Sequence, residues 1–392
     1  MNGGFGRPGP TPWNGWLSQS ISQIRSSDRW RQLRDFDGTG VAGVLEGRPI
    51  VSFASNDYLG LSHHPAVIQG AKRSLSAWGA GAGSSRLISG TRPIHSQLED
   101  AICEWKGTQR AVVYSSGFSA NLGLITAIGG PEVTIFSDSL NHASIIDGCR
   151  LSQSRVRVYD HLDNAHLQSL MQVDESPRKI IISDSIFSMD GDIADIPKLT
   201  AIAELFDAIL VLDEAHAVLG PDLPFGLAAS DNVIRIGTLS KTLGSLGGFV
   251  ACNSAFADLL INTSRPFIFS TGLSPADAGA AVSALEVLTS AEGAKLIAKL
   301  RDNVHHLASE SKSQIIPVLV GPEAETIQLA QQLLLRGLFV PAIRPPTVPL
   351  DTARLRISVS ADHEANHLDL LTSSMCDFGF KNDVCGFSRA SE

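Results

Sequence analysis

The sequence lacks an excess of positive charge and any long apolar run. Lys and Arg number 31 against 40 Asp and Glu, so the formal net charge of the 392 residues is −9. Proteins that bind nucleic acid or anionic membranes mainly through phosphate contacts need a basic surface, so neither partner is expected. No stretch reaches about 18 uncharged apolar residues, and the N-terminal MNGGFGRPGPTP has no basic segment followed by an apolar one. We therefore expect a cytoplasmic protein without a membrane span or a targeting segment.

Cysteine is scarce as well. The chain has five, at positions Cys103, Cys149, Cys252, Cys376 and Cys385. None of them forms a C-x-x-C pair, and the spacing matches no common zinc motif. The sequence therefore predicts reduced thiols and no bound metal.

Short apolar runs rich in β-branched residues alternate with segments of helical periodicity from about residue 50 onward. The runs are AVVY (111–114), VTIF (133–136), VRVY (156–159), KIIIS (179–183), AILVLD (208–213), VIRIG (233–237) and GFVAC (248–252). Helical spacing lies between them, for example at 118–129 and 197–207. This alternation predicts an α/β fold with a mostly parallel sheet covered by helices.

The pattern changes after Pro275. An Ala- and Leu-rich stretch predicts one long helix over 275–310, and a helix is expected at about 322–336. Three strand-like runs complete this region, IIPVLVG (315–321), LFVPAIR (338–344) and RLRISVS (354–360). These elements predict a smaller α+β C-terminal domain.

Three parts of the chain follow from these patterns. They are an N-terminal leader and helix that packs on the site (1–49), a large domain (50–275) and the C-terminal domain with a polar tail (276–392). Within the first part, the Gly- and Pro-rich residues 1–15 are expected to be flexible and about 16–36 to form a polar helix. The tail after about 378 is expected to fray.

Asp213 and His216 follow a buried-strand pattern in AILVLDEAH (208–216). Both should therefore lie at the carboxyl edge of the parallel sheet, where such sheets bind ligands. The string DEAH also occurs in nucleotide-driven motors, but these need a phosphate loop G-x-x-x-x-G-K-[ST], which the sequence lacks.

Lys241 lies in GTLSKTLGSLGG (237–248), directly after the run VIRIG, with no other charged residue from 236 to 257. A lysine held among small residues can have a depressed pKa and act as a carbonyl-trapping amine. Pyridoxal phosphate needs such a lysine, together with a carboxylate that keeps its ring nitrogen protonated. Lys241 and Asp213 could supply these two groups.

Three turns after other strands complete the candidate cofactor site. In SSGFSAN (115–121), Gly117 and Phe118 are expected to begin a helix, and their backbone N–H groups can bind a phosphate there. His142 in LNHAS and Ser188 in IFSMDGD follow further strands at the same expected edge.

On these residues the chain resembles the α-oxoamine synthases, a family of pyridoxal-phosphate enzymes with the aspartate-aminotransferase fold (fold type I). The resemblance runs from about 16 to 365 and rests on SFASNDYLGLSHHP (52–65), GAGAGSSRLISGT (79–91), SSGFSAN, NHAS, FSMDGD, LDEAH, GTLSKTLG, FSTGLSP (269–275) and AIRPPTVPLDTARLRIS (342–358). Where the family often has Glu, this chain has Asp184.

The resemblance implies a role for each matching residue. Lys241 would be the Schiff-base lysine, Asp213 the partner of the pyridine nitrogen, and His142 a catalytic residue stacked on the ring. Ser188 and His216 would lie near the phenolic oxygen, and Thr238 with the Gly117 and Phe118 amides around the phosphate. Arg356 would bind the carboxylate of the amino acid, and Arg31, Asn56 and Thr347 would contact substrate.

The resemblance also implies a homodimer with shared active sites, in which Thr271 reaches the phosphate of the neighbouring subunit. The reaction it implies is a decarboxylative condensation of L-alanine with a pimeloyl thioester, carried by CoA or a carrier protein, as in biotin biosynthesis. RPPTVP (344–349) favours this branch. Glycine C-acetyltransferase-like and serine palmitoyltransferase-like enzymes remain alternatives.

Functions other than that of an α-oxoamine synthase are less well supported by the sequence. A non-catalytic partner subunit of the same fold would have no need of Lys241. GAGAG (79–83) does not fit the dinucleotide-binding pattern G-x-G-x-x-G, and no G-x-S-x-G of a serine hydrolase occurs.

Overall fold

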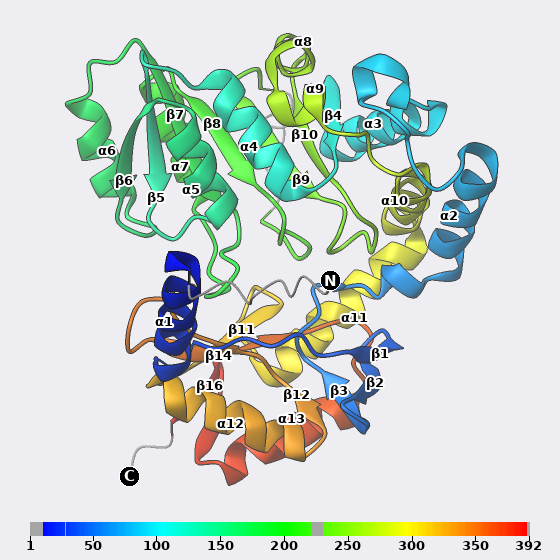
Figure 1. The fold of residues 1–392 in the computed structure, drawn as a ribbon, viewed down its shortest axis with the longest axis vertical. Coiled ribbons are helices and arrows are strands. Elements are labelled where there is room, and N and C mark those ends of the chain that lie inside the picture. Colours follow the sequence, from blue (N-terminus) through cyan, green and yellow to red (C-terminus); the bar gives the residue numbers. More distant parts are fainter. Residues whose placement is uncertain (1–10, 28, 222–229, 390–392) are drawn as a thin grey trace, which may run out of the picture.

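Two lobes, each built on its own sheets, make up the molecule (Figure 1). The computed structural model describes residues 11–27, 29–221 and 230–389. The larger lobe holds a sheet with the order β4-β10-β9-β8-β7-β5-β6, in which β10 runs antiparallel to both neighbours and the other pairs are parallel. The strands are β4 (Arg110–Tyr114), β5 (Val133–Asp138), β6 (Arg155–Tyr159), β7 (Arg178–Asp184), β8 (Ile209–Asp213), β9 (Val233–Thr238) and β10 (Gly248–Cys252). Each predicted apolar run falls in one of these strands, so the mostly parallel α/β sheet is confirmed.

Helices shield this sheet from water on its faces, which is why its inner strands are largely apolar, whereas the edge strand β6 is mostly exposed and alternates Arg with Val. β5 and β10 are buried at every position. The helical elements of the lobe are η1 (Leu61–His63), α2 (Pro65–Trp78), η2 (Arg86–Gly90), α3 (Pro93–Lys106), α4 (Gly117–Ile128), α5 (Ala143–Leu151), α6 (Asn164–Gln172), α7 (Ile196–Leu205), α8 (Ser254–Thr263) and α9 (Arg265–Phe269). No helix among the described residues is long and apolar enough to cross a membrane.

The smaller lobe combines the two ends of the chain. A sheet with the order β11-β14-β13 lies beside a second sheet with the order β1-β2-β3-β12, in which β12 pairs in parallel with the N-terminal strand β3. The strands are β1 (Phe36–Thr39), β2 (Ala42–Leu45), β3 (Arg48–Ser52), β11 (Ile315–Gly321), β12 (Leu338–Phe339), β13 (Ala342–Ile343), β14 (Ala353–Ser358), β15 (Phe380–Asp383) and β16 (Gly386–Arg389). The helices of this lobe are α1 (Pro12–Ser26), α11 (Ala291–Leu307), α12 (Glu323–Leu335) and α13 (Ala365–Asp377), whereas α10 (Pro275–Leu288), which precedes α11, packs chiefly on α2 and α3 of the larger lobe (Figure 1).

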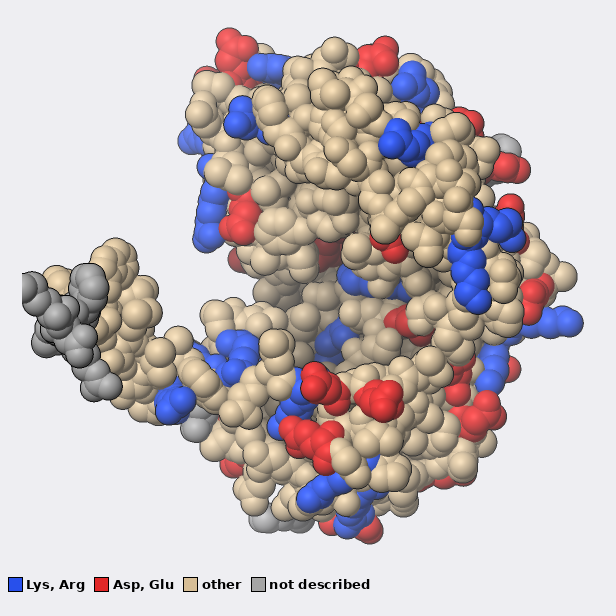
Figure 2. Space-filling view, turned by 45° about the vertical axis from the view of Figure 1, so that its right-hand side comes forward, with Lys and Arg blue, Asp and Glu red and all other residues tan. Residues whose placement is uncertain are grey.

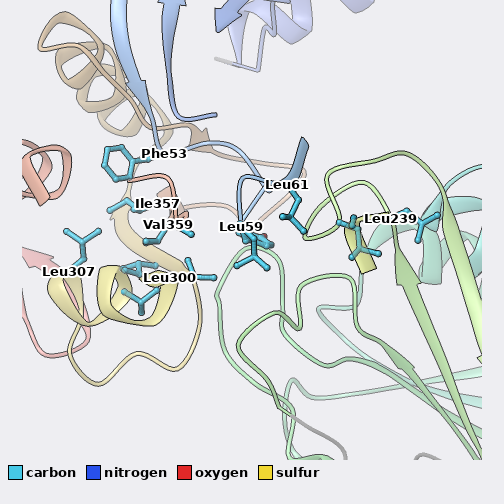
Figure 3. Close-up of a cluster of buried hydrophobic side chains, with 14 of the residues drawn as sticks. Phe53, Leu59, Leu61, Leu239, Leu300, Leu307, Ile357 and Val359 are labelled. Atoms are coloured by element: carbon cyan, nitrogen blue, oxygen red, sulfur yellow. The ribbon is translucent and has the colours of Figure 1, made fainter. Parts of the chain in front are cut away.

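The main hydrophobic core runs through both lobes. In Figure 3, Phe53 lies next to Ile357 of the smaller lobe, and Leu59 and Leu61 lie between Ile357 and Leu239 of the larger lobe; all five are at most 1% exposed. The segment that connects β3 to α2 is therefore wedged between the lobes. This placement brings the polar residues of the same segment to the edge of the large sheet.

Several local expectations are wrong. The polar helix expected at about 16–36 is α1, which ends at Ser26, and residues from Phe36 onward form strands instead. The leader expected at 1–15 lies outside the described residues as far as residue 10, and the chain is helical from Pro12. The long helix expected at 275–310 is divided into α10 and α11, because the Ser290 side chain accepts hydrogen bonds from the N–H groups of Glu292 and Gly293 and starts a new helix.

The tail after about 378 does not fray over the residues that the structure describes. β15 and β16 form a hairpin, and Phe380 and Phe387 are each 6% exposed because they belong to the main core. Burial of these two aromatic side chains supplies the stabilisation that a solvated tail would lack.

Candidate active site

The carboxyl ends of β7, β8 and β9 place three polar side chains next to one another. Asp184 and Asp213 are directly opposed in the register of β7 and β8, and Thr238 ends the next strand. A pocket of about 210 Å³ opens at this edge. It is lined by Ser116, Gly117, Phe118, Asn121, His142, Ser144, Asp184, Ser188, Asp213, Ala215, His216, Gly237, Thr238, Ser240 and Lys241. Figure 2 shows a deep cleft between the two lobes with basic side chains inside it.

Asp213 is fixed from two sides. The Asn121 side chain, from α4, donates to Asp213 Oδ2 at 2.7 Å, and the backbone N–H of Ala215 donates to Asp213 Oδ1 at 2.9 Å. Asp213 is only 5% exposed. The carboxylate is therefore held in one orientation within the pocket.

Lys241 lies in the loop after β9, with Nζ 2.7 Å from His216 Nε2. Burial disfavours the ammonium form and lowers the pKa of Lys241 to about 8, against the opposing effect of Asp213 and Asp184; the Arg356 charge adds to the lowering. A larger fraction of this amine than of an ordinary lysine is therefore uncharged, and nucleophilic, near neutral pH.

A chain of hydrogen bonds connects Lys241 to the wedge segment between the lobes. His216 Nδ1 lies 2.6 Å from the Tyr58 hydroxyl, which donates to Asn56 Oδ1 at 3.0 Å. Burial, with the charges of Lys241 and Arg356, holds the pKa of His216 well below its usual value, so its ring is neutral. Because Tyr58 donates to Asn56, His216 Nδ1 must donate to Tyr58, and Nε2 then accepts from Lys241.

Arg356 of β14 closes this chain. It is 5% exposed and donates to Asn56 Oδ1 at 3.1 Å and to Ser358 Oγ at 2.8 Å. Its Nε donates to the carbonyl oxygen of Ser188. Its Nη2 also donates to the Tyr58 hydroxyl at 3.5 Å, so the guanidinium lies at the boundary of the two lobes, two hydrogen bonds from His216.

His142 is the N-cap of α5 and is partly exposed at the pocket. Its backbone N–H donates to Asp184 Oδ2 at 3.1 Å, and its Nδ1 lies 2.7 Å from Ser144 Oγ. Burial and the neighbouring Asp213 raise the pKa of Asp184 well above its usual value. Asp184 thus orients His142 from a position in which the family often has Glu.

The first turn of α4 forms one wall of the pocket. Ser116 caps the helix by accepting from the N–H of Ser119 at 3.1 Å, and Gly117 and Phe118 line the pocket. A Cβ added to Gly117 would lie 3.2 Å from Thr238 Cβ. This close approach of backbone and side chain forms an anion cradle at a positive helix end.

These groups fit pyridoxal phosphate. The pocket contains an amine of depressed pKa, an oriented carboxylate and a helix N-terminus, which are the partners that the cofactor's carbonyl, ring nitrogen and phosphate require. Among the described groups, Asn121 Oδ1 is also buried without a hydrogen-bond partner at this pocket.

Most predicted site residues come together, and three do not. Lys241, Asp213, His142, Ser188, His216, Thr238, Gly117 and Phe118 line one pocket, and Asn56 and Arg356 join it through Tyr58. Arg31 lines a separate pocket with Trp30 and Arg344. Thr347 is exposed in a turn, and Thr271 is exposed and bridges to Ser85.

Sequence reasoning missed Tyr58, Asn121 and Ser144. Asn121 lies four residues after Gly117 on one face of α4, so helical spacing could have pointed to it. Tyr58 stands in the motif SNDYLGL, but only the wedge between the lobes brings it to His216.

Comparisons with known proteins show the family of this chain. The family described as Aminotransferase class I and II matches residues 48–374. A relative named 8-amino-7-oxononanoate synthase, from Geobacter sulfurreducens, is 40% identical over 382 residues, which are 93% of this chain and 97% of the relative.

Two solved structures are similar. A serine palmitoyltransferase with pyridoxal phosphate is 26% identical with a TM-score of 0.85, covering 94% of this chain and 97% of its own. An 8-amino-7-oxononanoate synthase from Francisella tularensis is 26% identical with a TM-score of 0.68, covering 83% and 96%. The chain therefore belongs to the aminotransferase class I and II family, with the fold of the α-oxoamine synthases. Within that fold, its sequence is similar to the 8-amino-7-oxononanoate synthases.

Proposed function

We propose that this protein is a pyridoxal-phosphate-dependent acyltransferase that condenses L-alanine with a pimeloyl thioester to give 8-amino-7-oxononanoate, carbon dioxide and the free carrier, a step of biotin biosynthesis. The observation that carries the proposal is the meeting of Lys241, Asp213 and His142 in one pocket. Relatives of this name at 40% identity over nearly the whole chain support the choice of substrates.

Each part of the cofactor has a candidate partner. Lys241 Nζ would hold it covalently, Asp213 would bind its ring nitrogen, and His142 would cover the ring. The Gly117 and Phe118 amides with Thr238 would bind its phosphate, and Ser188 and His216 would lie near its phenolic oxygen. When bound, the cofactor supplies an electrophilic carbonyl and a ring that accepts electrons from the substrate's Cα.

The chain's own residues then bind substrate and move protons. Arg356 carries the positive charge that a carboxylate of L-alanine needs, and it is already oriented by Asn56 and Ser358. Lys241 Nζ, in its uncharged form, can accept the Cα proton of the substrate, and neutral His216 keeps its lone pair directed at that amine. The partly exposed His142 can donate a hydrogen bond to the oxygen of the acyl group as negative charge develops there.

Serine palmitoyltransferase activity is the second candidate, because the serine palmitoyltransferase structure has the higher TM-score, 0.85 against 0.68. Both solved structures are equally distant in sequence at 26%, whereas the 8-amino-7-oxononanoate synthase of Geobacter reaches 40%. Shared fold is weak evidence for a shared substrate. We therefore rank L-alanine and the pimeloyl thioester first.

We also propose a cytoplasmic homodimer with shared active sites. The five cysteines are free thiols, as suits a reducing compartment. Thr271 is exposed in the single chain, as a residue that serves a partner's site would be.

The test is a comparison of substrate pairs on the purified protein with pyridoxal phosphate. L-alanine with pimeloyl-CoA should release CoA fastest, ahead of glycine with acetyl-CoA and of L-serine with palmitoyl-CoA, and mass spectrometry should detect 8-amino-7-oxononanoate. The Lys241→Ala variant serves as the inactive control. Faster turnover of either other pair would move the protein to that branch, and full turnover by Lys241→Ala would end the proposal altogether.

A further inference from the structure

His161 joins two loops of the site without lining the pocket. It follows β6, which lies next to β5 at the end of the large sheet, while β7 flanks β5 on the other side. Its Nδ1 is 2.9 Å from Asp138 Oδ1 and its Nε2 is 2.7 Å from Asp192 Oδ2. One ring is thus held by a carboxylate at each nitrogen, which requires that both nitrogens donate.

Asp138 holds the turn that leads to His142. It ends β5 and is 2% exposed, and its side chain also accepts from the N–H groups of Leu140 at 2.8 Å and Leu162 at 2.9 Å. The backbone N–H of Asn141 donates to its carbonyl oxygen at 3.3 Å. The position of His142 at the N-cap of α5 therefore depends on where Asp138 is held.

Asp192 closes the loop that carries Ser188. Its carbonyl oxygen accepts from the backbone N–H of Phe187 at 3.0 Å, and the Phe187 ring meets the His161 ring edge to face with centroids 4.4 Å apart. Asp190 of the same loop pairs with Arg354 of β14. The loop is thus held by His161 on one side and by the smaller lobe on the other.

We propose that His161 is a positioning residue, whose imidazolium sets the distance between the turn that carries His142 and the loop that carries Ser188. The inference rests on the proposed function in that these two residues face the cofactor pocket. His161 itself touches neither the pocket nor Lys241.

The charge of His161 supports this role. Burial alone would lower its pKa, but the hydrogen bonds and charges of Asp138 and Asp192 outweigh that effect and raise the pKa to about 10. Because this value lies above that of an unfolded His, the ring is charged at neutral pH. The paired contacts of His161 with Asp138 and Asp192 are lost as the pH rises through about 10.

The test uses His161→Gln, which keeps much of the size but removes the charge and one of the two contacts. The matched control is His166→Gln, because His166 pairs with Asp160 on the nearby surface at 3.0 Å and touches no site loop. Amide hydrogen exchange, measured without added cofactor, should become faster in 139–142 and 187–192 of His161→Gln and stay unchanged elsewhere. His166→Gln should match the wild type.

Kinetics give the second readout. A misplaced His142 should lower kcat of the holoenzyme about 10- to 100-fold with a smaller change in KM, and wild-type kcat should fall toward the variant's value above pH 10. Unchanged exchange in both loops, or a variant with the kcat and pH profile of His166→Gln, would overturn the inference. If His161→Gln does not fold, Asp192→Asn tests the same contact by the same two readouts. A wild type without turnover would count against the proposed function, whereas the exchange result would still decide the role of His161.

Discussion

At the scale of single residues, burial decides how the ionisable groups of the pocket behave. It lowers the pKa values of Lys241 and His216 and raises that of Asp184, so three groups that would be charged or half charged in water are shifted toward their neutral forms. Asp213 is held in one orientation, because the Asn121 side-chain amide and the Ala215 backbone N–H donate to its carboxylate. The pocket thus contains one oriented carboxylate beside a reactive amine.

The depressed pKa of Lys241 predicts how its capture of a carbonyl depends on pH. Only the uncharged amine is nucleophilic, so the rate of pyridoxal-phosphate capture should rise with pH and reach half its limit near pH 8. Stopped-flow absorbance from pH 6.5 to 9.5 measures this rate. A midpoint at the usual lysine value near 10.4 would show that burial does not act on this amine as described.

The hydrogen bond from Asn121 to Asp213 predicts how a substitution of Asn121 changes kcat. Asn121→Ala removes the side-chain donor to Asp213, a contact of the kind worth about 1.5–3 kcal/mol when one partner is charged. We expect kcat to fall about 10- to 150-fold, with the cofactor still bound. Asn262→Ala, which removes an exposed amide on α8 that donates to Asp258, should leave kcat unchanged. A wild-type kcat in Asn121→Ala would mean that Asp213 needs no such support.

At the scale of elements, the loop after β9 places Lys241 by packing against the wedge segment. Gly244 has a φ of +58°, and a Cβ there would lie 2.1 Å from the backbone nitrogen of Ser62. The loop and the η1 turn can therefore meet only because Gly244 has no side chain. This contact joins the lysine loop to the segment that carries Asn56 and Tyr58.

Gly244→Ala should move the lysine loop. We expect a lower melting temperature and a kcat reduced by at least about tenfold, because the added Cβ meets backbone atoms that cannot turn away. Gly47→Ala is the matched control, since Gly47 has a φ of +77° but no atom within 4 Å of its added Cβ. Differential scanning calorimetry and steady-state kinetics of both variants measure the difference. Equal losses in the two variants would show that only backbone strain matters at Gly244.

The elements also show what a sequence can reveal. Strands such as β5 and β10 were predictable because burial on both faces produces a continuous apolar run, whereas the edge strand β6 is mostly exposed and alternates Arg with Val. The break between α10 and α11 was marked by Ser290, a capping residue inside an Ala- and Leu-rich stretch, and the apolar pattern concealed it. The short, exposed strand β1 left no such run, because its stability comes from pairing with β2 rather than from burial.

At the scale of the whole molecule, the site lies where the two lobes meet. Lys241 and Asp213 come from the large sheet, Arg356 from the smaller lobe, and Asn56 and Tyr58 from the wedge between them. Lys241 and Asp213 could be predicted from the sequence because each stands at or just after the end of an apolar strand. The Tyr58 contact with His216 joins residues 158 positions apart, and no local pattern encodes it.

The proposed homodimer predicts an effect of Thr271, which lines no part of its own chain's cofactor pocket. Thr271→Val should weaken pyridoxal-phosphate binding by several-fold, because the partner's phosphate loses one hydrogen bond worth about 1 kcal/mol. Thr263→Val, on an exposed face of α8, should bind the cofactor normally. Fluorescence titration measures both affinities, and sedimentation equilibrium should give twice the chain mass of 41.6 kDa. A monomer of wild-type activity would refute the shared site.

The most direct test of the central claim is to find the cofactor's point of attachment. The protein incubated with pyridoxal phosphate should be yellow, and borohydride reduction followed by peptide mass spectrometry should place the pyridoxyl group on Lys241. The account predicts this single modified lysine and its loss in Lys241→Ala. A colourless protein, or a label carried by another lysine while Lys241→Ala retains full turnover, would contradict it.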